Sequence, residues 1–139
     1  MSQRHVDPDR ERFALLKQLP RDEPADMLNL VRLYEEARYV DGRAATGAEA
    51  YAAYGRESAS IFKRVGGSIV WSGDPRFVVI GPPDERWDIA FIARYPSGQA
   101  FLDMVYDTQY QAVVHHRQAA VETSRLIRMR PRDTSDGFG

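Results

Sequence analysis

The sequence predicts an α+β domain in which helices cover one face of an antiparallel sheet. The chain has 139 residues, which suits one domain with a single core. Its apolar residues change between helical and strand-like spacing in the order helix, strand, helix, strand, strand, strand, broken helix, strand. This order is a split β-α-β arrangement extended by a hairpin strand, which places the helices on one sheet face.

The N-terminal part is predicted to form a short helix followed by a linker. Asp7 can accept from the free amides of a first helical turn, and Pro8 fits the first helical position. Two later prolines end this helix. We therefore assign residues 1–24 to a helix and linker and 25–130 to the α+β domain. Residues 131–139, which are polar and rich in glycine, are predicted to form a flexible tail.

The stretch MLNLVRLY, residues 27–34, is predicted to form the first strand. Both of its alternating faces are mainly apolar, so both faces of the sheet should be covered. Residues 35–47 have no periodicity and are expected to form a long loop. From 48 to 65 the apolar residues recur at intervals of three and four, which predicts an amphipathic helix that ends at Gly66 and Gly67.

The second half of the chain supplies the remaining predicted strands and a broken helix. SIVWSG (68–73) and RFVVIG (76–81) flank an Asp-Pro turn signal and are expected to pair as an antiparallel ribbon. WDIAFIARYP (87–96) is a third apolar strand. Ser97 can cap a helix that breaks at Asp107-Thr108 and resumes over residues 110–121. Residues 125–129 then form the last strand.

Composition and motifs exclude several classes of function. With 19 basic and 20 acidic residues the net charge is −1, which disfavours nucleic acid and anionic membranes as partners. The chain contains no cysteine, which removes thiolate chemistry and is typical of a cytoplasmic protein. No apolar run approaches the roughly 18 residues of a membrane helix. Phosphate loops, dinucleotide fingerprints and nucleophile elbows are absent from the sequence, so we expect no cofactor.

Metal binding is not expected either. His115 and Glu122 share one helical face at a spacing of seven, but no third ligand is recognisable. A second copy of the chain is the expected partner, because helices cover only one face of an apolar sheet. Two sheets that pack across a two-fold axis would hide the other face, so we expect a homodimer.

Five separated stretches together resemble one family of uncharacterised proteins. They are MLNLVRL, TGAEAYAAYG, RVGGSIVWSG, ERWDIAFIARYPS and YQAVVHHRQAAVETSRLI, and the likeness covers about residues 10 to 129. The family is the domain of unknown function 1330, within the dimeric α+β barrel, ferredoxin-like superfamily. The resemblance implies a ferredoxin-like subunit whose sheet packs on that of its partner. Related superfamily members include cofactor-free quinone-forming monooxygenases, isomerase-like enzymes and haem proteins, with ligands between helices and sheet.

The candidate site residues follow from the residues themselves and from this resemblance. Asn29 lies in a matching motif and could polarise a ligand carbonyl or phenol, or it could satisfy a backbone group near the long loop. His116 and Arg117 match the family pattern and could move a proton and bind a carboxylate, or could be structural and surface residues. Tyr54 and Trp71 lie on elements expected to border the cavity. Catalytic candidates are Asn29 and His116.

Three functions remain open from the sequence. The first is a homodimeric protein that binds a small, partly apolar molecule in a cavity between helices and sheet. The second is a cofactor-independent oxygenase or isomerase in which Asn29 holds an oxyanion and His116 moves a proton. The third is a structural dimer without a ligand site. The face of strand 27–34 that carries Asn29 distinguishes them: toward the helices it borders the cavity, and toward the partner it supports the dimer.

Overall fold

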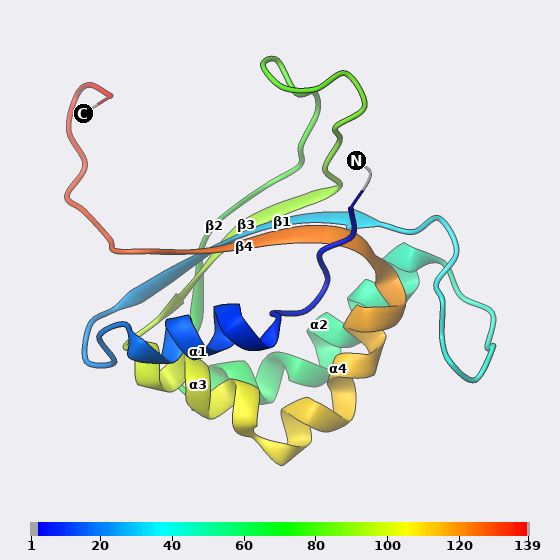
Figure 1. Ribbon diagram of the computed structural model, residues 1–139, viewed down its shortest axis with the longest axis horizontal. Coiled ribbons are helices and arrows are strands. Elements are labelled where there is room, and N and C mark those ends of the chain that lie inside the picture. Colours follow the sequence, from blue (N-terminus) through cyan, green and yellow to red (C-terminus); the bar gives the residue numbers. More distant parts are fainter. Residues whose placement is uncertain (1–2, 139) are drawn as a thin grey trace.

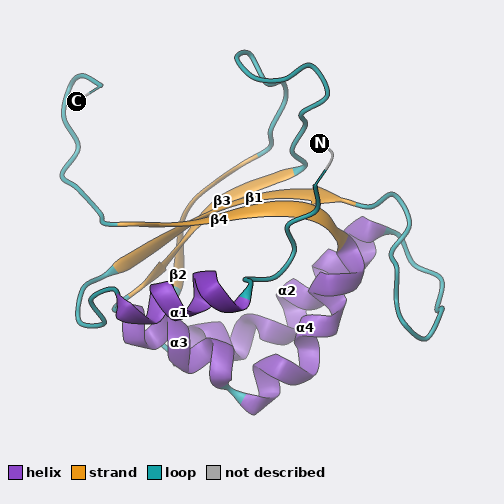
Figure 2. Ribbon diagram, in the orientation of Figure 1, coloured by secondary structure: helices purple, strands orange, loops and turns teal. Residues whose placement is uncertain are grey.

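In the computed structural model, which describes residues 3–138, four helices lie on one side of a four-stranded antiparallel sheet (Figures 1 and 2). The elements are α1 (Arg10–Gln18), β1 (Ala25–Leu33), α2 (Gly47–Arg64), β2 (Ser68–Gly73), β3 (Ile89–Tyr95), α3 (Gly98–Tyr106), α4 (Thr108–Ala120) and β4 (Val121–Met129). The predicted fold class is confirmed. Within the described residues no helix is both long enough and apolar enough to cross a bilayer.

The sheet has the strand order β2-β3-β1-β4, so β1 lies in its interior. Asn29 is opposite Phe91 of β3 and opposite Leu126 of β4. Met27 and Val31, which share its strand face, are buried, whereas Leu28 and Leu30 on the other face are only half-buried. Asn29 therefore faces the helices.

The ends of the helices follow local capping chemistry. Thr46 and Glu49 form a capping box at the start of α2, in which each side chain accepts from the backbone of the other. Asp107 ends α3 and begins α4, where its carboxylate accepts from the amides of Gln109 and Tyr110. This carboxylate produces the predicted break. The helix that follows ends earlier than predicted, because β4 begins directly at Val121.

The first helix begins two residues later than predicted. Its N-cap is Asp9, whose carboxylate accepts from the amide of Arg12 at 2.7 Å. Asp7 is instead held by the side chains of Arg117 and Gln118 on α4. The tertiary contacts of Asp7 thus displace the helix start.

The predicted strand over residues 76–81 is wrong. β2 pairs with β3, and residues 74–86 form a projecting segment that we call the arm. The arm rises from the side of the sheet that faces away from the helices (Figure 1), and its Phe77 and Ile80 are 82% and 94% exposed. Residues 89–95 replace the predicted partner because β3 completes two ladders at once, one with β2 and one with β1.

The core is divided into two clusters by the interior of β1. One cluster contains Met27 with Ile61 and Tyr95, and the other contains Val31 with Val121. Asn29 lies between Met27 and Val31 on the same strand face, so its polar side chain separates two apolar regions.

Candidate functional site

A cavity of about 450 Å³ lies between the helices and the sheet, at the position where Asn29 divides the core. Its walls come from all four strands, from α2, α3 and α4, and from the N-terminal segment with α1. Most of the lining is apolar, with aromatic rings from Phe13, Tyr51, Tyr54, Phe62, Phe91, Tyr95, Phe101 and Tyr110. A cavity of this size and lining suits a small molecule with an apolar body.

Asn29 contributes an amide to the cavity wall. Its Nδ2 donates to the carbonyl of Met27 at 3.1 Å. Among residues 3–138 no group donates to its Oδ1, so this oxygen remains free to accept. The nitrogen thus satisfies a backbone carbonyl, which is the structural role considered for Asn29. The oxygen can still accept a hydrogen bond from a ligand, which is its binding role.

Tyrosine hydroxyls supply donors on the helical side of the cavity. Tyr51, Tyr54 and Gly55 belong to one stripe of α2 that lines it. The hydroxyls of Tyr54 and Tyr110 lie 2.9 Å apart, so one donates to the other. Burial raises the pKa of Tyr51 to about 12 and that of Tyr54 well above the usual value for a phenol. These phenols are therefore neutral donors at physiological pH.

Arg117 is the cationic residue of the cavity wall among the described residues. It is 14% exposed, and its guanidinium donates to the carbonyl of Val6 at 2.5 Å and to Ser124 Oγ at 3.2 Å. Asp7 lies 3.7 Å away and also lines the cavity. The structure thus brings Asn29, Tyr54 and Arg117, three of the predicted site residues, to one cavity.

His116 does not line the cavity. Its Nε2 lies 2.9 Å from the carboxylate of Glu57 on α2, and its Nδ1 lies 2.6 Å from the hydroxyl of Tyr39. Adjacent helical residues point about 100° apart, so a helix that directs Arg117 into the cavity directs His116 away from it. With both ring nitrogens engaged, His116 fastens the loop of residues 34–46 to α2 and α4.

Trp71 lies on the opposite face of the sheet and is 52% exposed, which corrects its predicted place at the cavity. The physical reason is a register shift between Ile69 and Trp71. Regular alternation would give these two residues the same face, but a bulge between them leaves Ile69 in the cavity wall and turns Trp71 outward.

Several lining residues were not predicted from the sequence. Tyr51 and Tyr110 have helical spacing that is equally typical of core residues, and Asp7 was assigned to a helix cap. Within residues 3–138 no three metal-ligating side chains come together, and His115 and Glu122 do not form part of such a group.

The sheet order and the one-sided helices define the class as a ferredoxin-like α+β protein. The chain belongs to the family described as a domain of unknown function, DUF1330, whose profile matches residues 30–129. No curated protein matches the chain.

Solved structures agree with this fold. A protein of unknown function from Rhodopseudomonas palustris is 52% identical, with a TM-score of 0.91 over 95% of this chain and 100% of that chain. A methylated form of the same protein is 54% identical, with a TM-score of 0.91, 94% of this chain and 96% of that one. SnoaB, a cofactor-independent oxygenase from Streptomyces nogalater, is 16% identical over 83% of this chain and 99% of its own. Its TM-score of 0.53 shows likeness of fold alone.

Proposed function

We propose that this protein binds a small, partly apolar molecule in the cavity between its helices and its sheet. The observation that carries the proposal is the cavity itself, with about 450 Å³ of space where a domain of this size would otherwise pack its core. Its aromatic wall suits an apolar body, while Asn29 Oδ1 and the hydroxyl of Tyr51 supply polar contacts without competing partners among residues 3–138.

Binding is supported better than catalysis by the orientation of the polar groups. The proposed oxygenase or isomerase needs a donor at Asn29, and one of the two N–H groups of its amide nitrogen is already donated to Met27. It also needs a proton carrier in the cavity, and the two nitrogens of His116 are engaged with Glu57 and Tyr39 outside it. The third function, a structural dimer, would require side chains to fill the space.

Native mass spectrometry of the freshly purified protein tests the binding function without a guess about the ligand. We expect a mass in excess of the polypeptide that disappears on denaturation and is reduced in Asn29→Leu. Recovery of the bare chain, together with failure of the cavity to take up apolar probes at millimolar concentration, would contradict the proposal.

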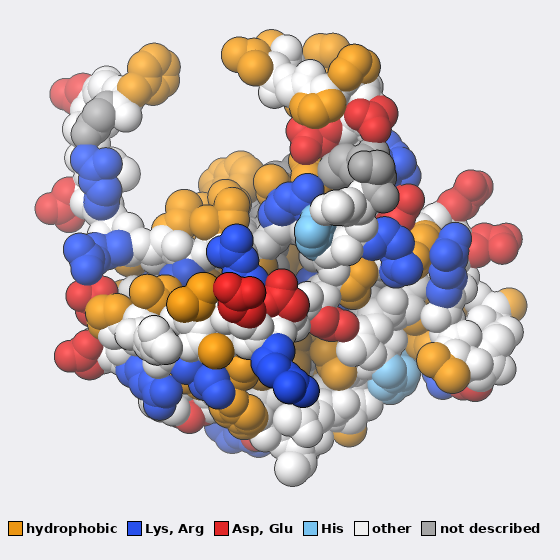
Figure 3. All heavy atoms as spheres, in the orientation of Figure 1, with side chains coloured by type: hydrophobic (Ala, Val, Ile, Leu, Met, Phe, Trp, Pro, Cys, Tyr) orange, Lys and Arg blue, Asp and Glu red, His pale blue; other side chains and the backbone are white. Residues whose placement is uncertain are grey.

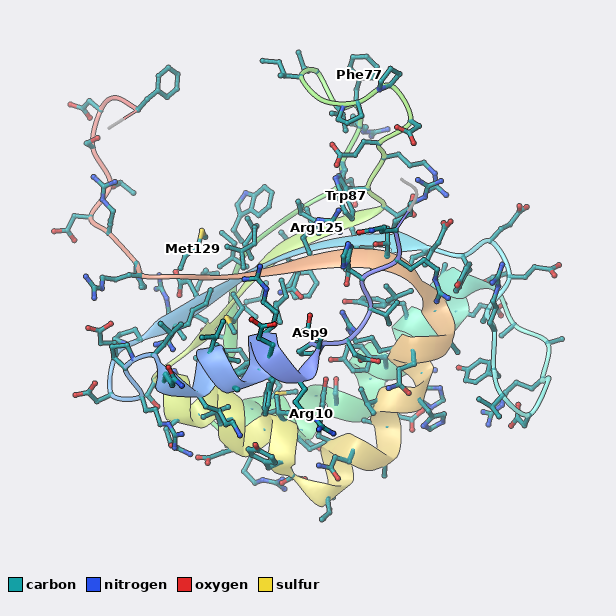
Figure 4. The ribbon with its side chains drawn as sticks, viewed as in Figure 1. Asp9, Arg10, Phe77, Trp87, Arg125 and Met129 are labelled. Carbon is teal, nitrogen blue, oxygen red and sulfur yellow. The ribbon has the colours of Figure 1, made fainter. Side chains whose placement is uncertain are left out.

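We also propose that two copies associate through the sheet face that the helices leave open. Ile92 and Ile127 lie on this face, and Trp71 adds an exposed ring. Figure 4 shows Trp87, Arg125 and Met129 on the same side of the sheet. The charge of Arg94 on this face is neutralised within the chain by a bidentate ion pair with Asp26. This contact removes one source of charge repulsion between two such faces.

The arm supports the same association. The apolar side chains of its tip are largely exposed, and Figure 3 shows hydrophobic side chains at its end, beyond the open face. Asp88 holds its base, donating from its amide to the carbonyl of Val31 and accepting from the amide of Leu33. About six residues lead from the base of the arm to its tip, and six extended residues reach about 20 Å. This is roughly twice the distance between two packed sheets, so the tip would extend past the partner's sheet and contact the partner beyond it.

Sedimentation velocity at micromolar concentration tests this association. We expect the mass of two chains for the wild type and a weakened dimer when Phe77, Val79 and Ile80 are all changed to serine. Val40→Ser is the control, because Val40 is also a highly exposed apolar residue but lies on the loop of residues 34–46. A monomeric wild type would contradict the dimer, while a dimer unaffected by the triple change would contradict the role of the arm.

A further inference from the structure

The N-terminal segment closes one side of the cavity and is held there by Arg117. Residues 3–6 lie along β4, where the carbonyl of His5 accepts from the amide of Ser124 at 2.7 Å. Val6 packs against the core cluster that contains Val31. The chain then crosses the cavity wall through Asp7 and Pro8. We call residues 3–9 the strap.

The helix that follows the strap is weakly held along its length. No residue of α1 is buried, and Phe13 touches Tyr106 edge-on at 5.9 Å between ring centroids. Its far end is fastened separately, because Arg128 donates to the carbonyl of Pro20 at 2.6 Å. The strap and α1 are therefore fixed at two ends and lie over the cavity between them.

The charges at the strap are unequally solvated. Arg117 is 14% exposed, whereas the side chain of Asp7 is 49% exposed. Their closest atoms are 3.7 Å apart, beyond hydrogen-bond distance, and Gln118 donates to the same carboxylate at 3.2 Å. A buried cation gains most from a counter-ion in direct contact, and the acidic neighbour that Arg117 has among the described residues is distant and half-solvated.

Arg117 also retains donors for another group. A guanidinium has five N–H donors, and two are used by Val6 and Ser124 among the described residues. Its charge acts on Tyr51 and Tyr54, for each of which it lowers the pKa against the larger effect of burial. The guanidinium and the two phenols thus line the same, largely apolar cavity.

We propose that the cavity binds a small carboxylic acid with an apolar body, whose carboxylate pairs with Arg117 and takes the place beside it that Asp7 now holds. The inference rests on the proposed binding function and names the chemical class of the ligand. Asp7 is then an internal competitor: its carboxylate lies beside Arg117 and turns to solvent when an acid enters. The acid's apolar part contacts the aromatic wall, and Tyr51 donates to its second oxygen.

Isothermal titration calorimetry with matched probes tests this proposal. The probes are 2-naphthoic acid and octanoic acid, each beside its primary amide, which has nearly the same shape without the charge. We expect the wild type to bind each acid roughly 10- to 100-fold more tightly than its amide, the range for hydrogen bonds to charged groups. Arg117→Met should abolish this preference, so that each acid and its amide bind with equal affinity.

Asp7→Asn keeps the test independent of any folding defect in the arginine variant. It should tighten acid binding about fivefold, as expected when an exposed competing ion pair is removed, and should increase the preference for each acid over its amide. Glu11→Gln is the control, since it removes one negative charge from an exposed position of α1 that does not line the cavity. It should change the affinity for neither the acids nor the amides.

The outcomes separate the two proposals. Equal binding of acid and amide by the wild type, or no gain of acid affinity in Asp7→Asn, would overturn the acid class and leave the binding function standing. Failure of all four probes to bind up to their solubility limits would overturn both.

Discussion

Replacement of Gly55 by leucine should stabilise the protein and block its cavity at the same time. Gly55 lies in the middle of α2, on the stripe that lines the cavity, and a Cβ built there meets no atom within 4 Å. Leucine favours a helix interior over glycine by about 0.5–1 kcal/mol. Partial burial of its side chain against the aromatic wall adds about 1 kcal/mol.

The expected sum is a gain of about 1.5–2 kcal/mol in the free energy of unfolding, with a rise in melting temperature of roughly 5 °C. Urea denaturation followed by far-UV circular dichroism measures the first quantity, and calorimetric titration with 2-naphthoic acid measures occupancy. Gly55→Ala is the matched control: it should take the gain from helix propensity and still bind the probe.

Either of two results would refute this reasoning. A less stable Gly55→Leu protein would mean that the position does not face open space. A more stable protein that binds the probe as the wild type does would place the ligand site outside the cavity.

Three further perturbations have defined expected results. Burial raises the pKa of Tyr51 to about 12, so as the pH rises the unfolded chain loses this proton before the folded protein does. The free energy of unfolding of the wild type should therefore fall between about pH 10 and 12 by roughly 2–3 kcal/mol more than that of Tyr51→Phe. Alkaline denaturation curves of both proteins measure this difference. His116→Phe should increase hydrogen exchange across residues 34–46 while the affinity for the probe stays unchanged. Loss of probe binding would instead show that His116 contributes to the ligand site. Gly47→Ala should lower the free energy of unfolding by about 2–3 kcal/mol, since its Cβ would lie 1.9 Å from the carbonyl oxygen of Tyr34. A urea denaturation midpoint equal to that of the wild type would contradict this contact.

Much of the fold could be predicted because its signals are local. Recurrence at three and four residues produces α2, and the carboxylate of Asp107 breaks the last helical region by accepting from two amides. The alternating apolar residues of 27–34 correctly predicted a strand, which lies in the interior of the sheet as β1. What failed was pairing: residues 76–81 have the composition of a strand, but β3 offers β2 a better ladder because it also pairs with β1.

Part of the site was also predictable from local sequence signals. Asn29 stands out because an amide interrupts an apolar run, and the family resemblance directed attention to Arg117. Trp71 was misplaced because a one-residue bulge reverses the face of every residue after it, and single-residue spacing does not reveal a bulge. Asp7 was missed because its partners, Arg117 and Gln118, are more than a hundred residues away in the chain.

The face of Asn29 is now known, and its side chain provides the most direct test of the binding function. Its amide nitrogen gives a pair of signals in a ¹H–¹⁵N NMR spectrum, and the indole signals of Trp71 and Trp87 report on the opposite side of the sheet. Titration with 2-naphthoic acid should shift the amide signals of Asn29 and leave both indole signals in place. Shifts of the indoles with an unmoved Asn29 would contradict a ligand site between the helices and the sheet.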